Sequence, residues 1–265
     1  MSELALTLSL TAAAVALLMI AVWLISVWKR DASIVDIGWG PGFALIAVVA
    51  FAVSDGALPR RALVTGLTVV WGLRLGGYLA WRAWGKPEDF RYQAMRRHWG
   101  ERFPIVSLFT VFALQGALMW IVSLPIQVAQ VARAPATLGA LDALGAGLWL
   151  VGMFFESVGD WQLARFKADP ASAGRVMDRG LWRYTRHPNY FGDCVVWWGL
   201  FAIALAVQGG AWTALGPLVM TVLLRRVSGV TLLERSLVKR RPGYAEYVTR
   251  TNAFVPGRPR TPPRA

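Results

Sequence analysis

The chain has 265 residues, of which 56% are hydrophobic and 14 are tryptophan, and its formal net charge is +13. The mean hydropathy is +0.46. This composition is typical of a polytopic membrane protein, which does not need the hydrophobic core of a soluble domain. The basic residues stand in short clusters between apolar runs, so we expect contact with membrane lipids or an anionic cofactor, and not with nucleic acid. One cysteine, Cys194, and two histidines exclude an intrachain disulfide framework and disfavour a metal centre.

The first apolar run, residues 4–28, has about the 20 residues that a transmembrane helix needs and is followed by Lys29 and Arg30. It lacks the basic start and the short apolar core of a signal peptide, so we expect a retained helix. A second, shorter span is predicted at residues 39–53, with Asp36 at its entrance.

The third predicted span, residues 62–84, carries Arg74 near its middle and Tyr78 one turn later. An arginine at this depth is costly unless it faces a polar interior, a partner or a ligand, so we expect a functional or buried-pair role for it. The polar connection that follows, residues 85–104, is predicted to form an amphipathic helix at the membrane interface. Most of its charges should face solvent, and Tyr92 and Gln93 are weaker site candidates.

A fourth span is predicted at residues 105–128, where Gln115 is expected to bond a neighbouring helix, and a fifth at residues 138–158. Glu156 and Asp160 lie one helical turn apart where the fifth span ends, and cations follow them. A local ion-pair network and a ligand-binding site are equal alternatives for this carboxylate pair.

Polar side chains are most concentrated in residues 180–198, at the start of a long apolar run. A helix starting here would place Asn189 and Asp193 on one face and would leave its first N–H groups free beside Arg186 and His187. Because helix-start amides and cations attract anions, we expect a phosphorylated or carboxylated ligand here. The alternative is that the arginines only mark the edge of a span.

The last two spans are predicted at residues 190–207 and 211–224, inside one transmembrane domain, residues 1–256, that is followed by a flexible tail, residues 257–265. Lysine and arginine gather after the first, third and fifth spans and near the C-terminus. The prediction is an all-α polytopic membrane bundle of about seven helices, with its N-terminus outside and its C-terminus in the cytoplasm. We expect it in a bacterial inner membrane.

The sequence contains no Gly-x-Ser-x-Gly elbow for nucleophilic catalysis, no Gly-x-Gly-x-x-Gly turn after a strand and no P-loop. A nucleotide would therefore bind between helices, with arginines, lysines and helix-start amides on its phosphates. In that case the cofactor supplies the difficult chemistry, and the protein positions a lipid-soluble substrate against it.

Three motifs carry a family resemblance. Residues 180–193 read Gly-Leu-Trp-Arg-Tyr-Thr-Arg-His-Pro-Asn-Tyr-Phe-Gly-Asp, and they follow Glu88-Asp-x-Arg91-Tyr92 and Glu156-x-x-x-Asp160-x-Gln162. Over most of its length the chain resembles the bacterial branch of the steroid 5-alpha-reductase family, often called the DUF1295 family. An Arg-His-Pro-x-Tyr core also occurs in isoprenylcysteine carboxyl methyltransferases and phospholipid methyltransferases, which use S-adenosylmethionine.

The resemblance implies a seven-helix membrane enzyme that holds NADPH in a cytoplasm-facing cavity and transfers hydride to the beta carbon of an enone. The cofactor contacts that it implies in this chain are Arg74, Asp160, Lys167, Arg175, Tyr184, Asn189 and Asp193. Three further residues around the predicted helix start, Arg186, His187 and Tyr190, complete the expected cofactor site.

The family resemblance also implies an acidic or phenolic group that polarises the substrate carbonyl. The Gln-Glu pair of the family's second helix has no match here, and the tyrosine expected near the start of the third falls at Trp71. Asp36 and Tyr78 are the available replacements and are the predicted catalytic residues. A carboxylic acid in a nonpolar cavity can stay protonated and donate to a substrate oxygen, as can a phenol.

Two other functions stay open. The Arg-His-Pro core, Glu234 and residues 244–247 would also suit a methyltransferase that uses S-adenosylmethionine, and a helical bundle alone would suit a non-catalytic lipid-binding protein. The long polar connection at residues 85–104 and the polar segment at residues 156–167 favour the reductase, because they add cations for a larger, more phosphorylated cofactor. No pattern predicts the oligomeric state.

Overall fold

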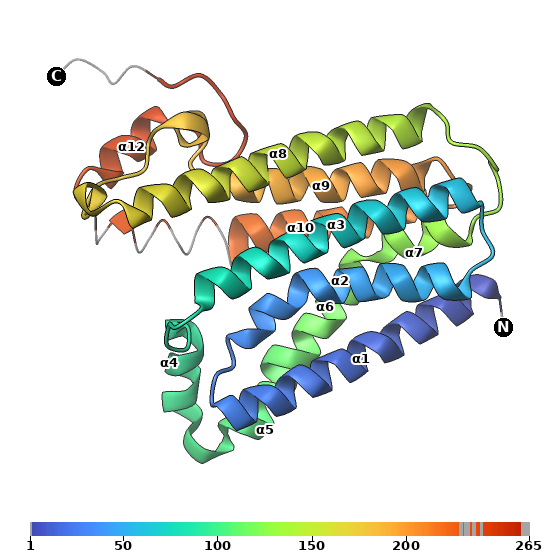
Figure 1. Ribbon diagram of the computed structural model, residues 1–265, viewed down its shortest axis with the longest axis horizontal. Helices are drawn as coiled ribbons and strands as arrows, with labels where there is room; N and C mark the ends of the chain where they lie inside the picture. The colour runs from blue at the N-terminus through green and yellow to red at the C-terminus, as the bar shows by residue number, and fades with distance from the viewer. Residues whose placement is uncertain (1, 228–229, 231–233, 235–236, 239–240, 261–265) are drawn as a thin grey trace. The chain divides into compact units, whose positions relative to one another are not determined.

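The structure is a computed structural model that describes residues 2–227, 230, 234, 237–238 and 241–260, and it consists of helices joined by short connections (Figure 1). The chain forms two compact units. Unit 1 comprises Met1–Ala143 and Phe201–Gly216, and unit 2 comprises Leu144–Leu200 and Pro217–Ala265.

Five helical stretches in the described part of the chain are long and apolar enough to cross a membrane. They are Glu3–Lys29, Ile34–Val53, Leu58–Ala83, Phe90–Val122 and Ala140–Ala168. The residues that the structure describes contain no strand. The prediction of an all-α membrane protein is therefore confirmed, whereas the count of seven spans, the orientation, the inner-membrane location and the single domain with its tail stay predictions.

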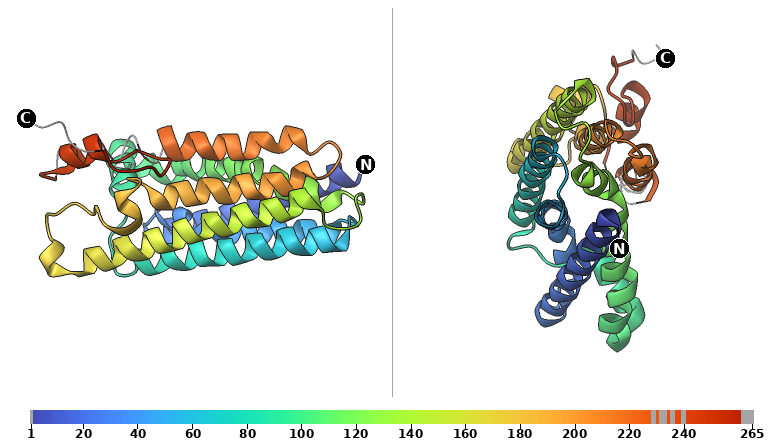
Figure 2. Two further views of the ribbon diagram at one scale, coloured as in Figure 1. Left: turned by 90° about the horizontal axis from the view of Figure 1, so that it is seen from above. Right: turned by 90° about the vertical axis from the view of Figure 1, so that its right-hand side faces the viewer.

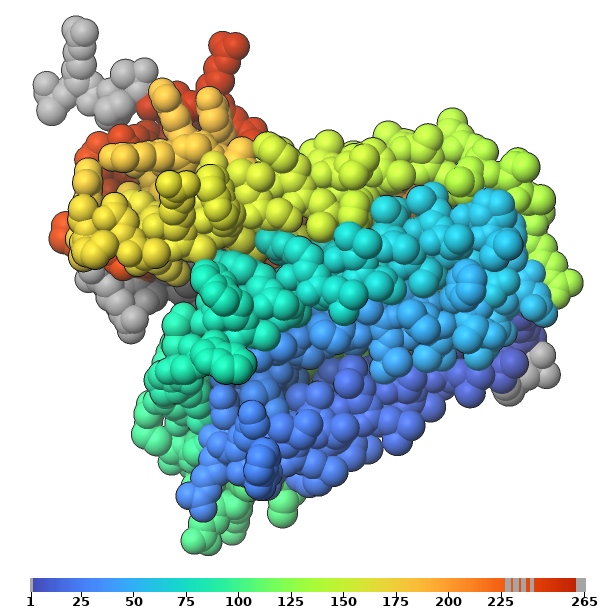
Figure 3. All heavy atoms as spheres, in the orientation of Figure 1, coloured from blue at the N-terminus to red at the C-terminus, as the bar shows by residue number. Residues whose placement is uncertain are grey.

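Unit 1 begins with three long helices, α1, α2 and α3, which lie side by side in that order (Figure 3). Their bounds are Glu3–Lys29, Ile34–Val53 and Leu58–Ala83. Ser2 caps α1 by accepting a hydrogen bond from the amide of Ala5 at 3.2 Å. Glu3 in the first turn and Lys29 in the last complement the helix dipole, so local sequence fixes both ends of this helix.

Two glycines let α2 and α3 approach each other closely. A Cβ atom at Gly40 would lie 2.1 Å from the carbonyl oxygen of Gly72, and one at Gly72 would lie 2.3 Å from that of Gly40. No larger residue fits at either position without moving a helix. Because α2 starts at Ile34, Asp36 lies in its first turn, inside the helix rather than in front of it as the sequence predicted.

The interfacial helix expected at residues 85–104 is α4, Phe90–Trp99. The residues after α4 continue as a helix that changes between 3-10, α and π geometry and breaks at Ser123. Its parts are η1 (Gly100–Arg102), α5 (Phe103–Ser107), η2 (Leu108–Ala113), α6 (Leu114–Val122) and α7 (Leu124–Val131). The predicted fourth span is therefore divided at Ser123, because Pro125 has no N–H to continue the helical ladder and lies instead in the first turn of α7. The short turn η5, Ala211–Ala214, contacts α7.

Unit 2 contains most of α8 and α9, the end of α10 and several short turns. Their bounds are α8 Ala140–Ala168, η3 Pro170–Ser172, η4 Gly180–Arg183, α9 Pro188–Leu205, α10 Leu215–Val222, η6 Leu223–Val227 and α12 Tyr244–Arg250. α8 and α9 run alongside one another (Figure 2). A Cβ atom at Gly192 of α9 would lie 2.5 Å from the carbonyl oxygen of Gly152 of α8. This close crossing brings the polar end of α8 next to the start of α9.

Candidate functional site

A polar cluster in unit 1 is built around Asp36. The first turn of α2 presents this carboxylate to α4. Its Oδ1 accepts a hydrogen bond from the Tyr92 hydroxyl at 2.8 Å, and its Oδ2 pairs with Arg91 at 2.8 Å. Asp36 is half-buried and Tyr92 is 5% exposed, so the phenol lies inside the protein and the carboxylate at its edge.

A chain of hydrogen bonds continues from Tyr92 into the helices. The side-chain amide of Gln115 donates to the Tyr92 oxygen at 3.2 Å, and the Trp39 indole donates to the Gln115 carbonyl at 2.5 Å. Gln115 therefore bonds neighbouring elements, as the sequence predicted. These hydrogen bonds join the start of α2, α4 and α6. They leave the Tyr92 phenol with one acceptor for its proton and one donor to its oxygen.

Glu88 holds the start of α4 against the turn between α1 and α2. It accepts from the amide of Ala32 at 2.8 Å and from two nitrogens of Arg96 at 2.8 and 3.0 Å. Burial alone would raise the pKa of Glu88, but the hydrogen bonds from Arg96 and Ala32 outweigh it and lower the pKa below its ordinary value. Asp89 caps α4 by accepting from the amide of Arg91 at 3.0 Å. These contacts position the Tyr92 phenol.

The tyrosine hydrogen-bonded to Asp36 is Tyr92, whereas the sequence offered Asp36 and Tyr78 as two separate candidate catalytic groups. Tyr78 packs with the cations of its own helix, because the Arg74 guanidinium lies 5.4 Å from its ring centroid and that of Arg82 lies 5.8 Å away. Local spacing showed only that Tyr92 belongs to an amphipathic helix. The useful signal was Asp89, a strong N-cap residue that places Tyr92 within the first turns of α4.

The cluster of unit 2 lies where α8 passes the start of α9. The Asn189 side-chain amide donates to Asp160 at 3.0 Å, and the Trp182 indole donates to the carbonyl of Gly159 at 3.0 Å. Asp160 is 4% exposed. Two of the predicted cofactor residues are thus hydrogen-bonded to each other. Asp193, one turn further along α9, lies in the same helix as Asn189.

Arg186 and His187 share one carboxylate, that of Glu234. Arg186 makes two contacts with it at 2.7 and 3.0 Å, and His187 Nε2 lies 3.0 Å from it. Arg186 also donates to the carbonyls of Val248 and Thr251. Both side chains are buried, with exposed fractions of 7% and 2%. The sequence predicted a ligand anion at this position, and the structure shows a carboxylate of the chain itself.

The pairing with Arg186 and His187 controls the charge of Glu234. Burial alone would raise the pKa of Glu234, but the hydrogen bonds from His187 and Arg186 and the charge of Arg186 lower it to about 2. Glu234 therefore stays ionised across the physiological range. The sequence placed it in a basic segment and gave no sign of its partners, which precede it by more than forty residues.

The rest of the motif is fixed by the C-terminal segment. The amide of Arg186 donates to the carbonyl of Asn252 at 2.9 Å, the Thr185 hydroxyl donates to that of Phe254 at 2.8 Å, and the Tyr247 hydroxyl donates to that of Trp182. Burial raises the pKa of Tyr247, which keeps this donor protonated. The 180–187 stretch is therefore held between the end of α8 and residues 244–257.

The other predicted cofactor residues have more exposed positions. Lys167 at the end of α8, Arg175 and Tyr184 are exposed, as are Arg179 and, inside η4, Arg183, which were not among the predicted cofactor residues. Tyr190 stacks on His187, with ring centroids 5.5 Å apart and an interplanar angle of 4°. The cations on this loop can approach a phosphate from solvent, whereas Arg186 would first have to leave Glu234.

Known proteins resemble this chain to different extents. An uncharacterized protein of Schizosaccharomyces pombe is 23% identical over 261 residues, which cover 88% of this chain and 75% of that protein. Human 3-oxo-5-alpha-steroid 4-dehydrogenase 1 is 32% identical over 69 residues, which cover 26% of this chain and 27% of that protein. The Bos taurus protein of the same name is 31% identical over 68 residues, and the match covers 26% of each chain. The likeness to these dehydrogenases is thus confined to about a quarter of their length.

No solved structure matches the chain significantly. One protein family, described as a protein of unknown function (DUF1295), matches residues 22–251. Because this match covers most of the sequence, the chain belongs to the DUF1295 family.

Proposed function

We propose that this protein is a membrane reductase that uses NADPH to saturate a carbon–carbon double bond conjugated to a carbonyl group in a lipid-soluble substrate. The observation that carries the proposal is the hydrogen bond of 2.8 Å between the Tyr92 hydroxyl and Asp36. Such a reaction needs a donor beside the carbonyl oxygen, because negative charge develops there as hydride reaches the beta carbon. The partial likeness to 3-oxo-5-alpha-steroid 4-dehydrogenases supports the same class of reaction.

Tyr92 acts as the donor in this proposal, and its neighbours orient it. Gln115 donates to the phenol oxygen at 3.2 Å, which leaves the phenol proton directed at an acceptor. A substrate carbonyl oxygen that replaces Asp36 as this acceptor would receive the hydrogen bond and, as charge develops, the proton. Arg91 balances the charge of Asp36 at 2.8 Å, so the ionised carboxylate stays at hand to orient the phenol, and a proton from solvent would restore the phenol after the transfer. Asp36 keeps a catalytic role, and Tyr92 takes the place of Tyr78.

The residues of unit 2 fit a nucleotide by charge and by donor chemistry. The exposed Arg175, Arg179 and Arg183 offer cations for phosphates. Asn189 and Asp160 offer an amide and a carboxylate, which can bind hydroxyl or amide groups. Bound NADPH would supply the hydride. The proposal retains Arg74, Lys167, Tyr184, Tyr190 and Asp193 as cofactor contacts and gives Arg186 and His187 the task of shaping the site.

The test uses protein purified in detergent micelles and titrated with NADPH, NADH or S-adenosylmethionine, with thermal unfolding as the readout. We expect stabilisation by NADPH, and NADPH consumption only when a hydrophobic enone is added. Asn189→Ala should weaken the stabilisation by NADPH while the unliganded protein unfolds near the wild-type temperature. Stabilisation by S-adenosylmethionine alone would replace the proposal with a methyltransferase, and stabilisation by no nucleotide would leave a lipid-binding role.

Tyr92→Phe tests the catalytic assignment. Removing a general acid should lower the turnover number by roughly 10²-fold or more while NADPH still stabilises the protein. Tyr78→Phe removes the same atom from the tyrosine that Asp36 does not contact, and it should keep most of the activity. If both variants lose activity equally, or if only Tyr78→Phe loses it, Tyr92 is not the proton donor.

A further inference from the structure

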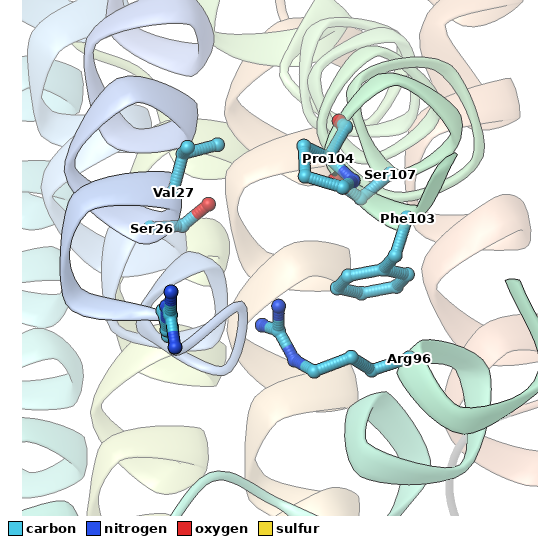
Figure 4. Close-up of a pocket in the computed structure, with 7 residues that line it drawn as sticks. Ser26, Val27, Arg96, Phe103, Pro104 and Ser107 are labelled. Carbon is cyan, nitrogen blue, oxygen red and sulfur yellow. Dashed lines mark hydrogen bonds between the residues drawn. The ribbon is translucent and has the colours of Figure 1, made fainter. Parts of the chain in front are cut away.

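A pocket opens between the end of α1 and the corner where α4 leads into α5, within unit 1 (Figure 4). It encloses about 270 Å³, and its walls are formed by Ser26, Val27, Arg30, Arg96, Phe103, Pro104 and Ser107. Ser26 and Val27 stand on the α1 wall, and Arg96 reaches in from the opposite side beside the ring of Phe103 (Figure 4). Of these residues, the reductase proposal involves only Arg96, through its hydrogen bonds with Glu88, and it gives the pocket itself no task.

Arg96 is held in place at the pocket wall. Its Nε and one terminal nitrogen bond Glu88 at 3.0 and 2.8 Å, and its guanidinium carbon lies 4.5 Å from the Phe103 ring centroid. The other terminal nitrogen has no hydrogen-bond partner among the described residues. Arg96 therefore offers a fixed donor to an incoming anion at no cost in side-chain ordering.

Arg30 gives the pocket a second, uncompensated charge. Its side chain is exposed, and within the described part of the chain it makes no hydrogen bond or ion pair. Its backbone has a φ of 54°, the left-handed conformation in which helices usually end on glycine. An arginine thus occupies a position where any side chain has a conformational cost, and it lines the pocket.

The two serines at the pocket already donate their protons within the protein, so the free donors at the pocket are guanidinium groups, which favour an anion. The Ser26 hydroxyl donates to the carbonyl of Trp23 at 2.8 Å, and the Ser107 hydroxyl donates to that of Pro104 at 2.9 Å. Their protons are therefore used, and the donors that remain are the two guanidinium groups. Guanidinium forks match the tetrahedral oxygens of a phosphate group.

The surroundings of the pocket are those of a membrane interface. Trp28 is 80% exposed at the end of α1, where amphipathic rings are expected at headgroup depth. On the hydrocarbon side, Leu24, Ile105 and Phe109 are 55%, 67% and 65% exposed. Only 22% of the most apolar stretch of α1 is buried inside the protein. A phosphate here would be joined by apolar contacts for acyl chains.

We propose that this pocket binds the phosphate group of an anionic membrane lipid, with Arg30 and Arg96 on the phosphate and the acyl chains along the exposed apolar residues of α1, α5 and η2. The test is reconstitution into vesicles of phosphatidylcholine with and without phosphatidylglycerol, followed by native mass spectrometry of the retained lipid. We expect phosphatidylglycerol to be retained in preference to phosphatidylcholine. Arg30→Gln should reduce this preference roughly tenfold, as expected for the loss of one charge-assisted contact.

Arg97→Gln is the matched control, because Arg97 is exposed on the same helix as Arg96 and does not line the pocket. It removes the same charge and should leave the preference unchanged. Equal losses in Arg30→Gln and Arg97→Gln, or no preference for phosphatidylglycerol in the wild type, would overturn the proposal. Displacement of the lipid by millimolar glycerol 3-phosphate would show that the pocket takes a soluble phosphate ester, which would overturn the lipid assignment.

Discussion

The buried pair of Arg60 and Asp142 in unit 1 gives a prediction whose size follows from the structure. Two nitrogens of Arg60 contact the two carboxylate oxygens at 2.8 and 3.0 Å, and each side chain is 1% exposed. Arg60 also donates to the carbonyls of Pro135 and Thr137 at 2.8 and 3.2 Å, and Asp142 accepts from the amide of Gly139 at 2.8 Å. The pair therefore fastens the connection before α8 to the start of α3.

Asp142→Ala should lower the free energy of unfolding by about 3–5 kcal/mol, because it leaves a buried guanidinium with carbonyl partners but no countercharge. The double variant Arg60→Met/Asp142→Ala should be more stable than Asp142→Ala alone, since it also removes the stranded charge. Unfolding by a denaturing detergent, followed by tryptophan fluorescence, measures both. Arg133→Met is the control, because Arg133 is 71% exposed in its pair with Glu3 and should cost about 0–1 kcal/mol.

The reasoning is refuted if the double variant is less stable than Asp142→Ala. That order would mean that the hydrogen bonds of Arg60 to the connection outweigh the uncompensated charge. It is also refuted if Asp142→Ala and Arg133→Met destabilise the protein equally, because burial would then make no difference to the strength of an ion pair in this protein.

Two further predictions concern unit 2. Since the pKa of Glu234 is about 2 in the fold and 4.5 ordinarily, its contribution to stability is complete above pH 4.5 and is lost as the pH falls towards about 2. Thermal unfolding of Glu234→Gln should therefore change less than that of the wild type across this window, and identical pH profiles would disprove the role of the pair. Gly192→Ala should cost roughly 1–3 kcal/mol, because the new Cβ would lie 2.5 Å from the Gly152 oxygen. Gly147→Ala, whose Cβ meets nothing within 4 Å, should be neutral or slightly stabilising, and equal effects of the two would contradict the close crossing of α8 and α9.

The helices could be predicted from the sequence because a bilayer demands long apolar runs and the chain provides them. The predicted ends were less accurate where polar residues continue a helix. Asp36 belongs to α2 and Asp160 to α8, where they accept hydrogen bonds from Tyr92 and Asn189. The hydrophobic pattern of a sequence shows that a residue is polar but not whether it has a hydrogen-bond partner in the fold. The predicted helices therefore ended before or at these carboxylates.

Only part of the candidate site could be predicted from the sequence, because the sequence does not show which distant residues pair. Asn189 and Asp160 stand in motifs that flank two close-packed helices, so their proximity could be expected. The hydrogen-bond partner of Asp36 is far away in the sequence, and from the sequence the catalytic phenol was predicted to be Tyr78, one of six tyrosines. The docking of α4 by Glu88 and by the Arg91–Asp36 ion pair brings Tyr92 to Asp36. That choice depends on tertiary contacts that no local spacing encodes.

Arg186 shows how the same motif can serve two tasks. A basic residue ahead of a helix start attracts an anion, and here the anion is the Glu234 carboxylate, held at 2.7 Å and ionised because its pKa is about 2. A phosphate that displaced it would leave that half-buried carboxylate beside a second negative charge and would also break the contacts of Arg186 with the Val248 and Thr251 carbonyls. Exposed Arg183, in η4 just before this pair, can bind a phosphate without either cost. Cofactor phosphates should therefore depend on the exposed loop, while Arg186 and Glu234 keep the C-terminal segment in the position that gives the loop its shape.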